Sequence, residues 1–184
     1  MDGVAVSPII VIMGVSGSGK TTLGHSLAAR LGWRYQDGDD FHPAANKSKM
    51  RAGVPLDDKD RAPWLAAIAA WMDARIRTGE PALIGCSALK RKYRDFLRHG
   101  RPQVWFLYLQ VPRPELQRRV RARQHAYMPA ALLDSQLDAL EEPAGDEPRC
   151  LTLDAAADLE ATTSRALRTL RAAAVIRQVP RVSG

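Results

Sequence analysis

Short apolar runs alternate with longer amphipathic segments along this chain. The runs are Ile9–Met13, Trp33–Gln36, Ala82–Cys86, Val104–Leu109 and Cys150–Leu153. Most of them are rich in β-branched or aromatic residues, which is typical of buried strands. Because amphipathic segments separate the runs, the pattern predicts βαβ units, in which helices cover a parallel sheet of about five strands.

The segments between the runs carry apolar residues at helical spacing. A long helix is expected after Asp57 and Asp58, whose carboxylates suit a helix N-terminus, and Gly79 suits its C-terminal end. Further helices are expected over Lys90–His99, Pro114–Arg123, Ala130–Leu140 and Leu159–Ile176.

The run Gly14–Thr21, with the sequence GVSGSGKT, directly follows the first expected strand. It fits G-x-x-x-x-G-K-[ST], the phosphate-binding loop or P-loop. Leu23, Leu27 and Leu31 then share one face of an expected helix. A strand, a glycine-rich turn and a helix in this order aim backbone N–H groups and the positive end of the helix dipole at one point. The chain is therefore expected to bind a nucleoside triphosphate.

The P-loop and the first helical turn carry the predicted nucleotide contacts. Lys20 can reach the β- and γ-phosphates, so a catalytic role is predicted for it, and the Thr21 hydroxyl can ligate Mg²⁺. The predicted contacts are Gly14, Val15, Ser16, Gly17, Ser18, Gly19, Lys20, Thr21 and Thr22.

The carboxylates of Asp37, Asp39 and Asp40 follow the second expected strand. They should therefore emerge at the C-terminal edge of the sheet, where open α/β sheets bind ligands. Alternation along an extended segment would place Asp37 and Asp39 on one side and Asp40 on the other. Asp37 is nearer the sheet and is predicted to serve Mg²⁺, whereas Asp39 is predicted to contact a hydroxyl acceptor as a catalytic group. A plain Asp/Gly turn that ends the strand is the alternative.

The length of 184 residues predicts one domain over residues 1–184. No apolar run approaches the roughly 20 residues that cross a bilayer, so no membrane partner is expected. Cys86 and Cys150 lie far apart without paired spacing. They are expected to be reduced residues of a cytoplasmic protein.

The net charge is +7, and basic residues crowd between Lys90 and Arg123. A nucleic-acid surface is one interpretation. The stretch lacks interleaved stacking aromatics and any nucleic-acid motif, so phosphate ligands and solvated faces are the preferred explanation, and no nucleic-acid partner is expected.

Two polar stretches do not fit a minimal sheet with helices, namely Asp37–Pro63 and Gln124–Pro129. They lie where small kinases carry an acceptor-binding insertion and a mobile lid, which keeps water away from the transferring phosphoryl group. The insertion is expected over residues 38–78, the lid over 123–130 and a frayed tail over 177–184.

The polar blocks also carry a resemblance to one family. The block DGDDFHP at Asp37–Pro43, followed by NKSKM at Asn46–Met50, GVPL at Gly53–Leu56 and DKDRAPWL at Asp58–Leu65, is similar to the gluconokinases. The likeness continues through CSALK at Cys86–Lys90, YRD at Tyr93–Asp95, LLDSQ at Leu132–Gln136 and LEEP at Leu140–Pro143. It covers nearly the whole chain from Ile9 to about Leu170.

The resemblance implies a three-layer P-loop NTPase fold of the α/β class, with an acceptor-binding helical insertion and a lid. It also implies ATP-dependent phosphorylation of D-gluconate on its 6-hydroxyl, with ATP and Mg²⁺ as cofactors. The expected partner is this small molecule, and a homodimer is one possible assembly.

A gluconate site needs cations for the carboxylate and hydrogen-bonding groups for the hydroxyls. The predicted substrate-binding residues are Asp39, His42, Lys49, Arg61, Lys90 and Arg94. Simpler roles stay open for three of them. Lys49 could be a solvated helix charge, Arg61 could pair with an acid near the helix start, and His42 could shape a turn before Pro43.

Arg119 and Arg123 lie four residues apart and share a helix face that leads into the expected lid. They are predicted to bind the nucleotide, and Arg123 is also predicted to be catalytic by neutralising phosphoryl charge. The lid departs from the family pattern, since His125-Ala-Tyr-Met128 stands where similar proteins often carry Gly-His-Phe. No catalytic histidine is assigned to it.

Two other functions remain in competition with a gluconate kinase. A shikimate or nucleoside-monophosphate kinase would share the P-loop and the aspartates but not the block through Trp64. A non-enzymatic P-loop switch is less favoured, because the chain has no Asn-Lys-x-Asp motif for guanine.

Overall fold

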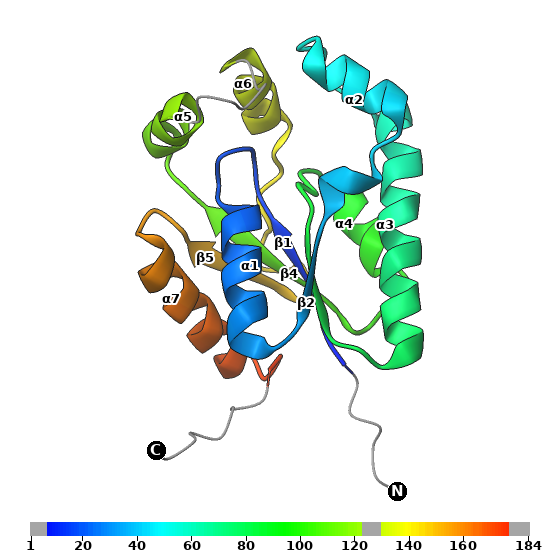
Figure 1. Ribbon diagram of the computed structural model, residues 1–184, viewed down its shortest axis with the longest axis vertical. Helices are drawn as coiled ribbons and strands as arrows, with labels where there is room; N and C mark the ends of the chain where they lie inside the picture. The colour runs from blue at the N-terminus through cyan, green and yellow to red at the C-terminus, as the bar shows by residue number, and fades with distance from the viewer. Residues whose placement is uncertain (1–6, 123–129, 177–184) are drawn as a thin grey trace, which may run out of the picture.

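The computed structural model describes residues 7–122 and 130–176. In this part of the chain, five parallel strands form one sheet in the order β2-β3-β1-β4-β5 (Figure 1). The strands are β1 (Ile9–Met13), β2 (Arg34–Asp37), β3 (Ala82–Gly85), β4 (Val104–Gln110) and β5 (Cys150–Asp154). Each strand matches an apolar run of the sequence to within about two residues, so the prediction of a five-stranded parallel sheet is confirmed.

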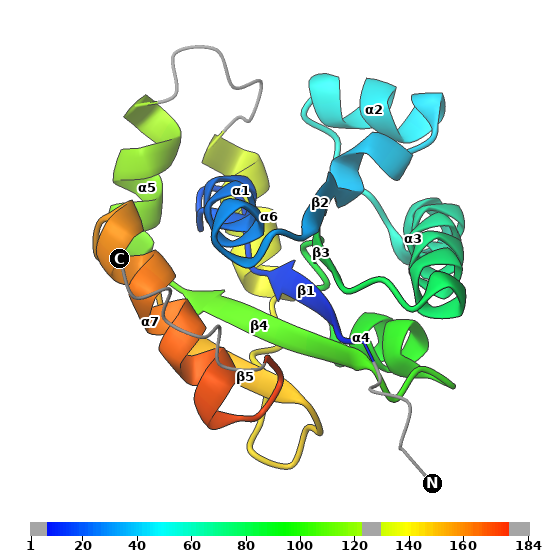
Figure 2. The ribbon, with the colours of Figure 1, turned by 60° about the horizontal axis from the view of Figure 1, so that its bottom comes forward.

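Helices cover both faces of the sheet, and α1 packs beside α7 on one face while α3 packs beside α4 on the other (Figures 1 and 2). The helical elements are α1 (Lys20–Leu31), the 3₁₀ turn η1 (Gly38–Phe41), α2 (Ala44–Arg51), α3 (Asp58–Thr78), α4 (Arg91–Arg98), α5 (Arg113–Ala122), α6 (Ala130–Ala139) and α7 (Leu159–Ala172). The expected three-layer α/β architecture is therefore confirmed.

The central strand β1 is buried on both sides. Ile10 and Ile12 pack in the apolar cluster under α1 and α7, whereas Ile9, Val11 and Met13 pack in the cluster under α3 and α4. All five side chains are fully buried. This two-sided burial explains why the strand reads as a continuous apolar run, and it holds the P-loop on a rigid support.

The long helix α3 begins and ends where the sequence indicates. Asp57 accepts a hydrogen bond from the Asp60 N–H, and the Asp60 carboxylate accepts one from the Asp57 N–H, which completes a capping box. Gly79 ends the helix in the left-handed region at φ 67°. The helix thus holds its first turn, which carries Arg61, in a fixed place.

The helices α2, α5 and α6 lie beyond the C-terminal ends of the strands, on the side where the P-loop leaves β1 (Figures 1 and 2). The sequence did not predict α2 as a separate helix, because it has no apolar stripe and Asn46 is its one buried residue. No helix among residues 7–122 and 130–176 has the length and apolar character to cross a bilayer.

Candidate active site

The P-loop occupies the turn between β1 and α1. Gly17 and Gly19 have φ angles of 83° and 101°, a region that side chains with a Cβ rarely adopt. α1 begins at Lys20, whose Nζ donates to the carbonyl oxygens of Gly14 at 3.0 Å and Val15 at 3.2 Å. The ammonium group therefore lies over the loop, in the place from which it could meet a phosphate.

Thr21 and Asp37 come together across the neighbouring ends of α1 and β2. The Thr21 hydroxyl donates to Asp37 Oδ2 at 2.9 Å, and Asp37 Oδ1 accepts from the Asp39 N–H at 3.0 Å. These are the two residues that the sequence singled out for Mg²⁺. A hydroxyl and one carboxylate are a suitable protein contribution, because Mg²⁺ in kinases keeps waters and phosphate oxygens as its other ligands. The residues present therefore fit this ion.

The segment after β2 does not continue as an extended chain. Residues Gly38–Phe41 form the 3₁₀ turn η1, which Asp37 caps and which the His42 N–H closes on the Asp39 carbonyl. The expectation of alternating sides for the three aspartates is therefore wrong. The turn nevertheless sends Asp37 toward Thr21 and Asp39 into a separate recess, while Asp40 accepts a hydrogen bond from Gln36.

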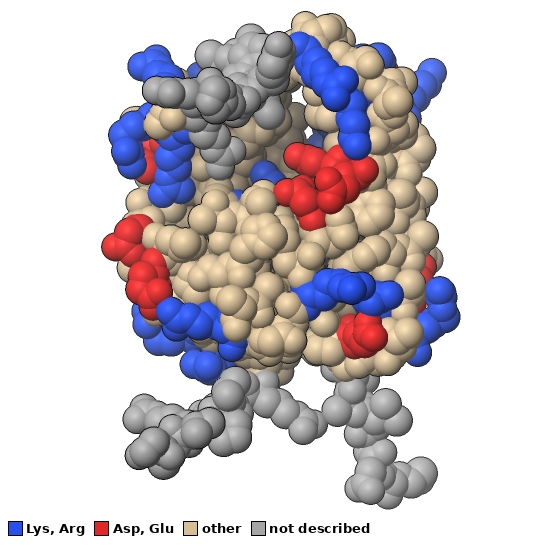
Figure 3. Space-filling view, in the orientation of Figure 1, with Lys and Arg blue, Asp and Glu red and all other residues tan. Residues whose placement is uncertain are grey.

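A recess of about 80 Å³, here called the acceptor pocket, opens between the P-loop, η1, α2, α3 and α6. Figure 3 shows the molecule hollowed in its upper part, with acidic side chains at the edge of the hollow. Asp39, His42 and Arg61 all line this pocket beside Lys20. The remaining lining residues are Ser16, Met50, Val54, Pro55, Leu56, Trp64, Ser87, Leu132, Ser135 and Gln136. Three of the predicted substrate residues therefore converge from different elements on one pocket.

Asp39 supplies an accessible carboxylate to the acceptor pocket. Its side chain is 75% exposed, so a polar molecule in the pocket could reach it. Desolvation by the surrounding protein raises the pKa of Asp39, Lys20 lowers it, and Asp37 and Asp40 raise it again. The net direction is upward, with desolvation as the largest cause. A carboxylate with a raised pKa is a stronger base than an ordinary aspartate.

His42 forms a wall of the same pocket. Its ring stacks on Trp64 with centroids 4.4 Å apart and planes 9° from parallel. The Trp64 indole N–H donates to the Gly38 carbonyl at 2.7 Å, which fixes the stack against η1. Burial lowers the pKa of His42 to about 4, and the nearby cations Arg61 and Lys47 act in the same direction. The imidazole is therefore neutral near pH 7.

Arg61 lines the pocket from the first turn of α3. Its Nη1 donates to the Tyr93 hydroxyl at 3.4 Å, and the group lies 5.7 Å from the centre of the Tyr93 ring. Among the described residues no carboxylate pairs with Arg61, so the alternative of a helix-start ion pair does not hold. A cation in this position suits an anionic ligand group.

Lys49 and Lys90 do not line the acceptor pocket, in contrast to the prediction. Lys49 Nζ lies 2.7 Å from Asp60 Oδ1, and Lys90 Nζ lies 3.0 Å from Asp58 Oδ1. Both acids belong to the first turn of α3, where carboxylates are favoured by the helix dipole. These two lysines therefore stabilise the start of α3 instead of presenting free charge to a substrate.

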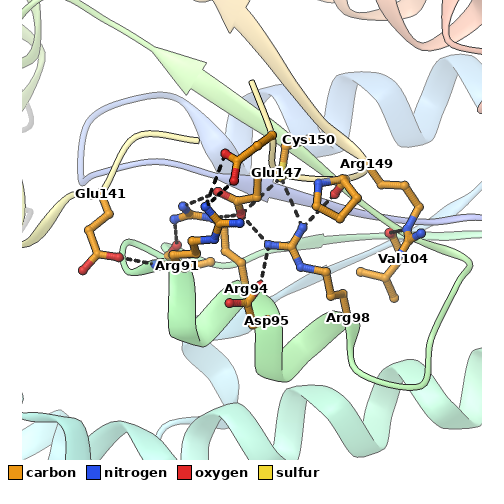
Figure 4. Close-up of polar contacts among 12 residues, drawn as sticks. Arg91, Arg94, Asp95, Arg98, Val104, Glu141, Glu147, Arg149 and Cys150 are labelled. Carbon is orange, nitrogen blue, oxygen red and sulfur yellow. Dashed lines mark hydrogen bonds and ion pairs between the residues drawn. The ribbon is translucent and has the colours of Figure 1, made fainter. Parts of the chain in front are cut away.

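The prediction that Arg94 binds substrate is corrected by the structure. Its side chain is fully buried and forms a double hydrogen bond with Glu147, with Nε to Oε1 at 2.6 Å and Nη2 to Oε2 at 2.8 Å (Figure 4). Its Nη1 donates to the carbonyl oxygens of Ala88 and Leu89. Arg98 also pairs with Glu147. Arg94 therefore joins the loop after β3 to the segment before β5, away from the pocket.

Glu147→Gln is expected to destabilise the fold by about 3–5 kcal/mol, because the fully buried Arg94 would lose its counter-charge and Arg98 would keep only its pair with Asp95. Burial raises the pKa of Glu147, but the two arginines outweigh burial and lower it to about 2. The contribution of this carboxylate to stability is therefore present above its ordinary pKa and lost as the pH falls toward 2.

Urea denaturation of the wild type and the variant at pH 7 and at lower pH measures this effect. The difference in the free energy of unfolding between the wild type and Glu147→Gln should become smaller as the pH falls. Asp146→Asn is the control, because its pair with Arg91 is exposed and should contribute less than about 1 kcal/mol. Equal losses in both variants would contradict the role given to Glu147.

A second cleft, of about 300 Å³, lies on the other side of the P-loop and is here called the nucleotide cleft. P-loop residues Gly17–Gly19 line it together with the end of α5 and the segment between β5 and α7. Arg119 is among its residues, and its guanidinium donates to the carbonyl oxygens of Ser18, Ala155 and Ala156. This places Arg119 at the cleft that could take a nucleotide.

Arg123 and most of the expected lid, including His125–Met128, lie outside the described residues, so their predicted roles stay predictions. One residue near the pocket was missed by sequence reasoning. Gln136, on α6, accepts a hydrogen bond from the Ser16 N–H of the P-loop at 2.7 Å. The signal was available, since Gln136 ends one of the blocks that carry the family resemblance.

The basic stretch is largely engaged in ion pairs. Besides the residues already described, Arg101 pairs with Asp73, Arg113 with Asp134, and Arg118 and Arg119 both with Glu115. Much of the positive charge of this stretch is therefore balanced locally.

Comparisons with known proteins agree with this geometry. A family model described as an AAA domain matches residues 9–143. The gluconokinase of Gluconobacter oxydans is 49% identical over 139 residues, which cover 76% of this chain and 78% of that protein. The chain belongs to the gluconokinase family. As a member of the gluconokinase family it is a kinase, and its nucleotide is bound by a P-loop.

Solved structures of similar proteins support the same family. A gluconokinase from Sinorhizobium meliloti superimposes with a TM-score of 0.82 at 41% identity, over 92% of this chain and 94% of that one. A sugar kinase from Janibacter sp. gives a TM-score of 0.84 at 45% identity, over 94% and 99% of the two chains. The gluconokinase fold therefore extends over nearly the whole of this chain.

Proposed function

We propose that this protein transfers the γ-phosphoryl group of ATP to the 6-hydroxyl of D-gluconate. The observation that carries the proposal is the position of the acceptor pocket, where Asp39, His42 and Arg61 meet beside Lys20. Gluconate is a polyol that ends in a carboxylate, so it needs one cation and several hydrogen-bonding groups. The pocket offers both kinds of group at the edge of a P-loop.

Each residue has a distinct task in this reaction. Lys20 and the N–H groups of the P-loop stabilise negative charge on the phosphates. Arg61 binds the carboxylate of the acceptor and so orients the chain of hydroxyls. Asp39 accepts the proton of the reacting hydroxyl as its oxygen attacks phosphorus. Arg119 holds the wall of the nucleotide cleft.

Mg²⁺ is part of the proposal, with Thr21 and Asp37 as its protein ligands. The hydrogen bond between the two side chains, at 2.9 Å, holds the Asp37 carboxylate beside the Thr21 hydroxyl oxygen. Both oxygens could therefore bind the same ion. When bound, the ion neutralises charge on the phosphate oxygens. We also infer that the protein acts in the cytoplasm, where its two cysteines, which form no disulfide, would remain reduced.

A panel of acceptors tests the function directly. The protein is incubated with ATP, Mg²⁺ and D-gluconate, other sugar acids, shikimate or nucleoside monophosphates, and ADP release is measured. Gluconate is expected to give the highest kcat/KM. Faster turnover of shikimate or a nucleotide would replace the proposal with another small-metabolite kinase, and no turnover of any acceptor would favour a non-enzymatic P-loop protein.

Arg61→Ala is expected to raise the KM for gluconate about 10- to 100-fold with a smaller change in kcat. The reason is that a charge-assisted bond to the carboxylate contributes similarly before and during the reaction. Steady-state kinetics at saturating ATP measure it. Lys59→Ala removes an exposed cation two residues away on α3 and is the control. A fall in kcat alone would contradict the assignment of Arg61 to carboxylate binding.

A further inference from the structure

Asn46 is a buried polar residue of α2 that does not line the acceptor pocket. It is 4% exposed, and its Nδ2 donates to the Asp60 carbonyl at 2.7 Å and lies 3.3 Å from His42 Nδ1. These contacts tie α2 to the start of α3 and to the wall of the acceptor pocket. They also determine which ring nitrogen of His42 carries the proton.

The orientation of the Asn46 amide follows from its partner on α3. The Asp60 carbonyl oxygen can only accept a hydrogen bond, so the nitrogen of the amide, and not its oxygen, must face it. The same nitrogen then directs its second hydrogen toward His42 Nδ1. A protonated Nδ1 would set two donors against each other, so Nδ1 is the acceptor and the proton of the neutral ring is on Nε2.

The Nε2–H of His42 faces the carboxylate of Asp39. His42 Nε2 lies 3.8 Å from Asp39 Oδ1, which is too long for a direct hydrogen bond. The gap leaves room for a hydroxyl oxygen that lies about 2.8 Å from both His42 Nε2 and Asp39 Oδ1. Such a hydroxyl would accept from His42 and donate to Asp39 at the same time.

We propose that Asn46 is a positioning residue, which holds His42 in the tautomer that presents its Nε2–H to an acceptor hydroxyl shared with Asp39. The ligand class is an alcohol, because the pair offers one donor and one acceptor to a single hydroxyl, and the proposed function makes that alcohol a polyol. The proposal rests on the proposed function for the identity of the acceptor, but the state of the ring can be measured without any substrate.

The environment of His42 supports a neutral donor. Arg61 on α3 and Lys47 on α2 face the ring with positive charge, while Asp39 on η1 faces it with negative charge. Trp64 covers one face of the ring. Burial and the two cations disfavour a second proton, so the donor remains neutral and keeps its direction.

The first measurement is the nitrogen NMR spectrum of the histidine side chains in the full-length protein, with the signals of His42 assigned by their loss in His42→Gln. Wild type should show a neutral ring protonated on Nε2. Asn46→Asp replaces the donor with a carboxylate and should bring a proton onto Nδ1. Ser48→Asp puts the same charge on an exposed position of α2 and should leave the ring unchanged.

Kinetics with gluconate and ATP give the second readout. Asn46→Asp should lower kcat/KM for gluconate about 10- to 100-fold, the range of one lost hydrogen bond in a buried site, and change the KM for ATP by less than about twofold. His42→Gln places an amide nitrogen near the position of Nε2, whereas His42→Asn places it near Nδ1. His42→Gln should therefore lose less activity than His42→Asn, even if Asn46→Asp folds poorly.

Several results would overturn the proposal. They are a wild-type ring protonated on Nδ1, an unchanged ring in a folded Asn46→Asp variant, or equal losses in the two His42 variants. Failure of the proposed function would appear differently, as an active wild type with a preference for another acceptor. The variants would then be compared on that acceptor.

Discussion

Lys20→Met is expected to reduce the turnover of gluconate by about 10²–10³, the usual cost of one preorganised charge contact with a transition state. The ammonium group lies over the P-loop, bonded to the carbonyl oxygens of Gly14 and Val15. Methionine keeps most of the stem and removes the charge. Because the loop opens onto both pockets, no core cavity is created, and the fold should be retained.

Steady-state ADP release measures the loss, and circular dichroism during heating checks the fold. Lys92→Met is the matched control, since Lys92 is an exposed lysine paired with Asp58. It should keep nearly full turnover. Near-normal turnover of Lys20→Met would contradict the P-loop assignment, and a strong loss in the control would show that surface charge matters more than the position of Lys20.

Most of the fold could be predicted because local signals and packing agree. The run Ile9–Met13 is apolar at every position, and the strand is buried on both sides. Asp57 and Gly79 carry local capping signals, and α3 begins and ends beside them. In contrast, α2 has one buried residue and no apolar stripe, so hydrophobic periodicity could not reveal it.

The candidate site could be predicted where a motif fixes geometry, and less well where it depends on distant partners. Thr21 lies in the first turn of α1 and Asp37 ends β2, so both could be expected at the C-terminal edge of the sheet from the βαβ order. Nothing near Arg94 in sequence shows that Glu147, 53 residues later, pairs with it. The sequence motif shows that Arg94 is a cation, but only the tertiary structure shows that an acid pairs with it.

The two pockets lie on either side of the P-loop and are lined by different elements. The nucleotide cleft is formed by the P-loop and by the segment after β5, whereas the acceptor pocket is formed by η1, α2, α3 and α6. Gln136 lines the acceptor pocket and accepts from the Ser16 N–H of the P-loop, so it ties α6 to the P-loop on the acceptor side.

Asp39→Asn should lower kcat for gluconate by about 10²–10⁴, the contribution of a well-placed general base. The variant keeps the shape of the side chain but cannot take the proton of the hydroxyl. ATP affinity should change by less than about twofold, because Asp39 lines the acceptor pocket and not the nucleotide cleft. Single-turnover kinetics and ATP titration measure the two effects separately.

The neighbouring aspartates provide matched controls for this result. Asp40→Asn alters a carboxylate that is bonded to Gln36 and should leave kcat nearly unchanged. Asp37→Asn removes the carboxylate bonded to Thr21 and should raise the Mg²⁺ concentration required for half-maximal rate. If Asp39→Asn weakened ATP binding while Asp37→Asn reduced kcat at every Mg²⁺ concentration, the two roles would have to be exchanged. Asp37 would then be the base, because only the group that takes the proton limits the chemical step when all ligands are saturating.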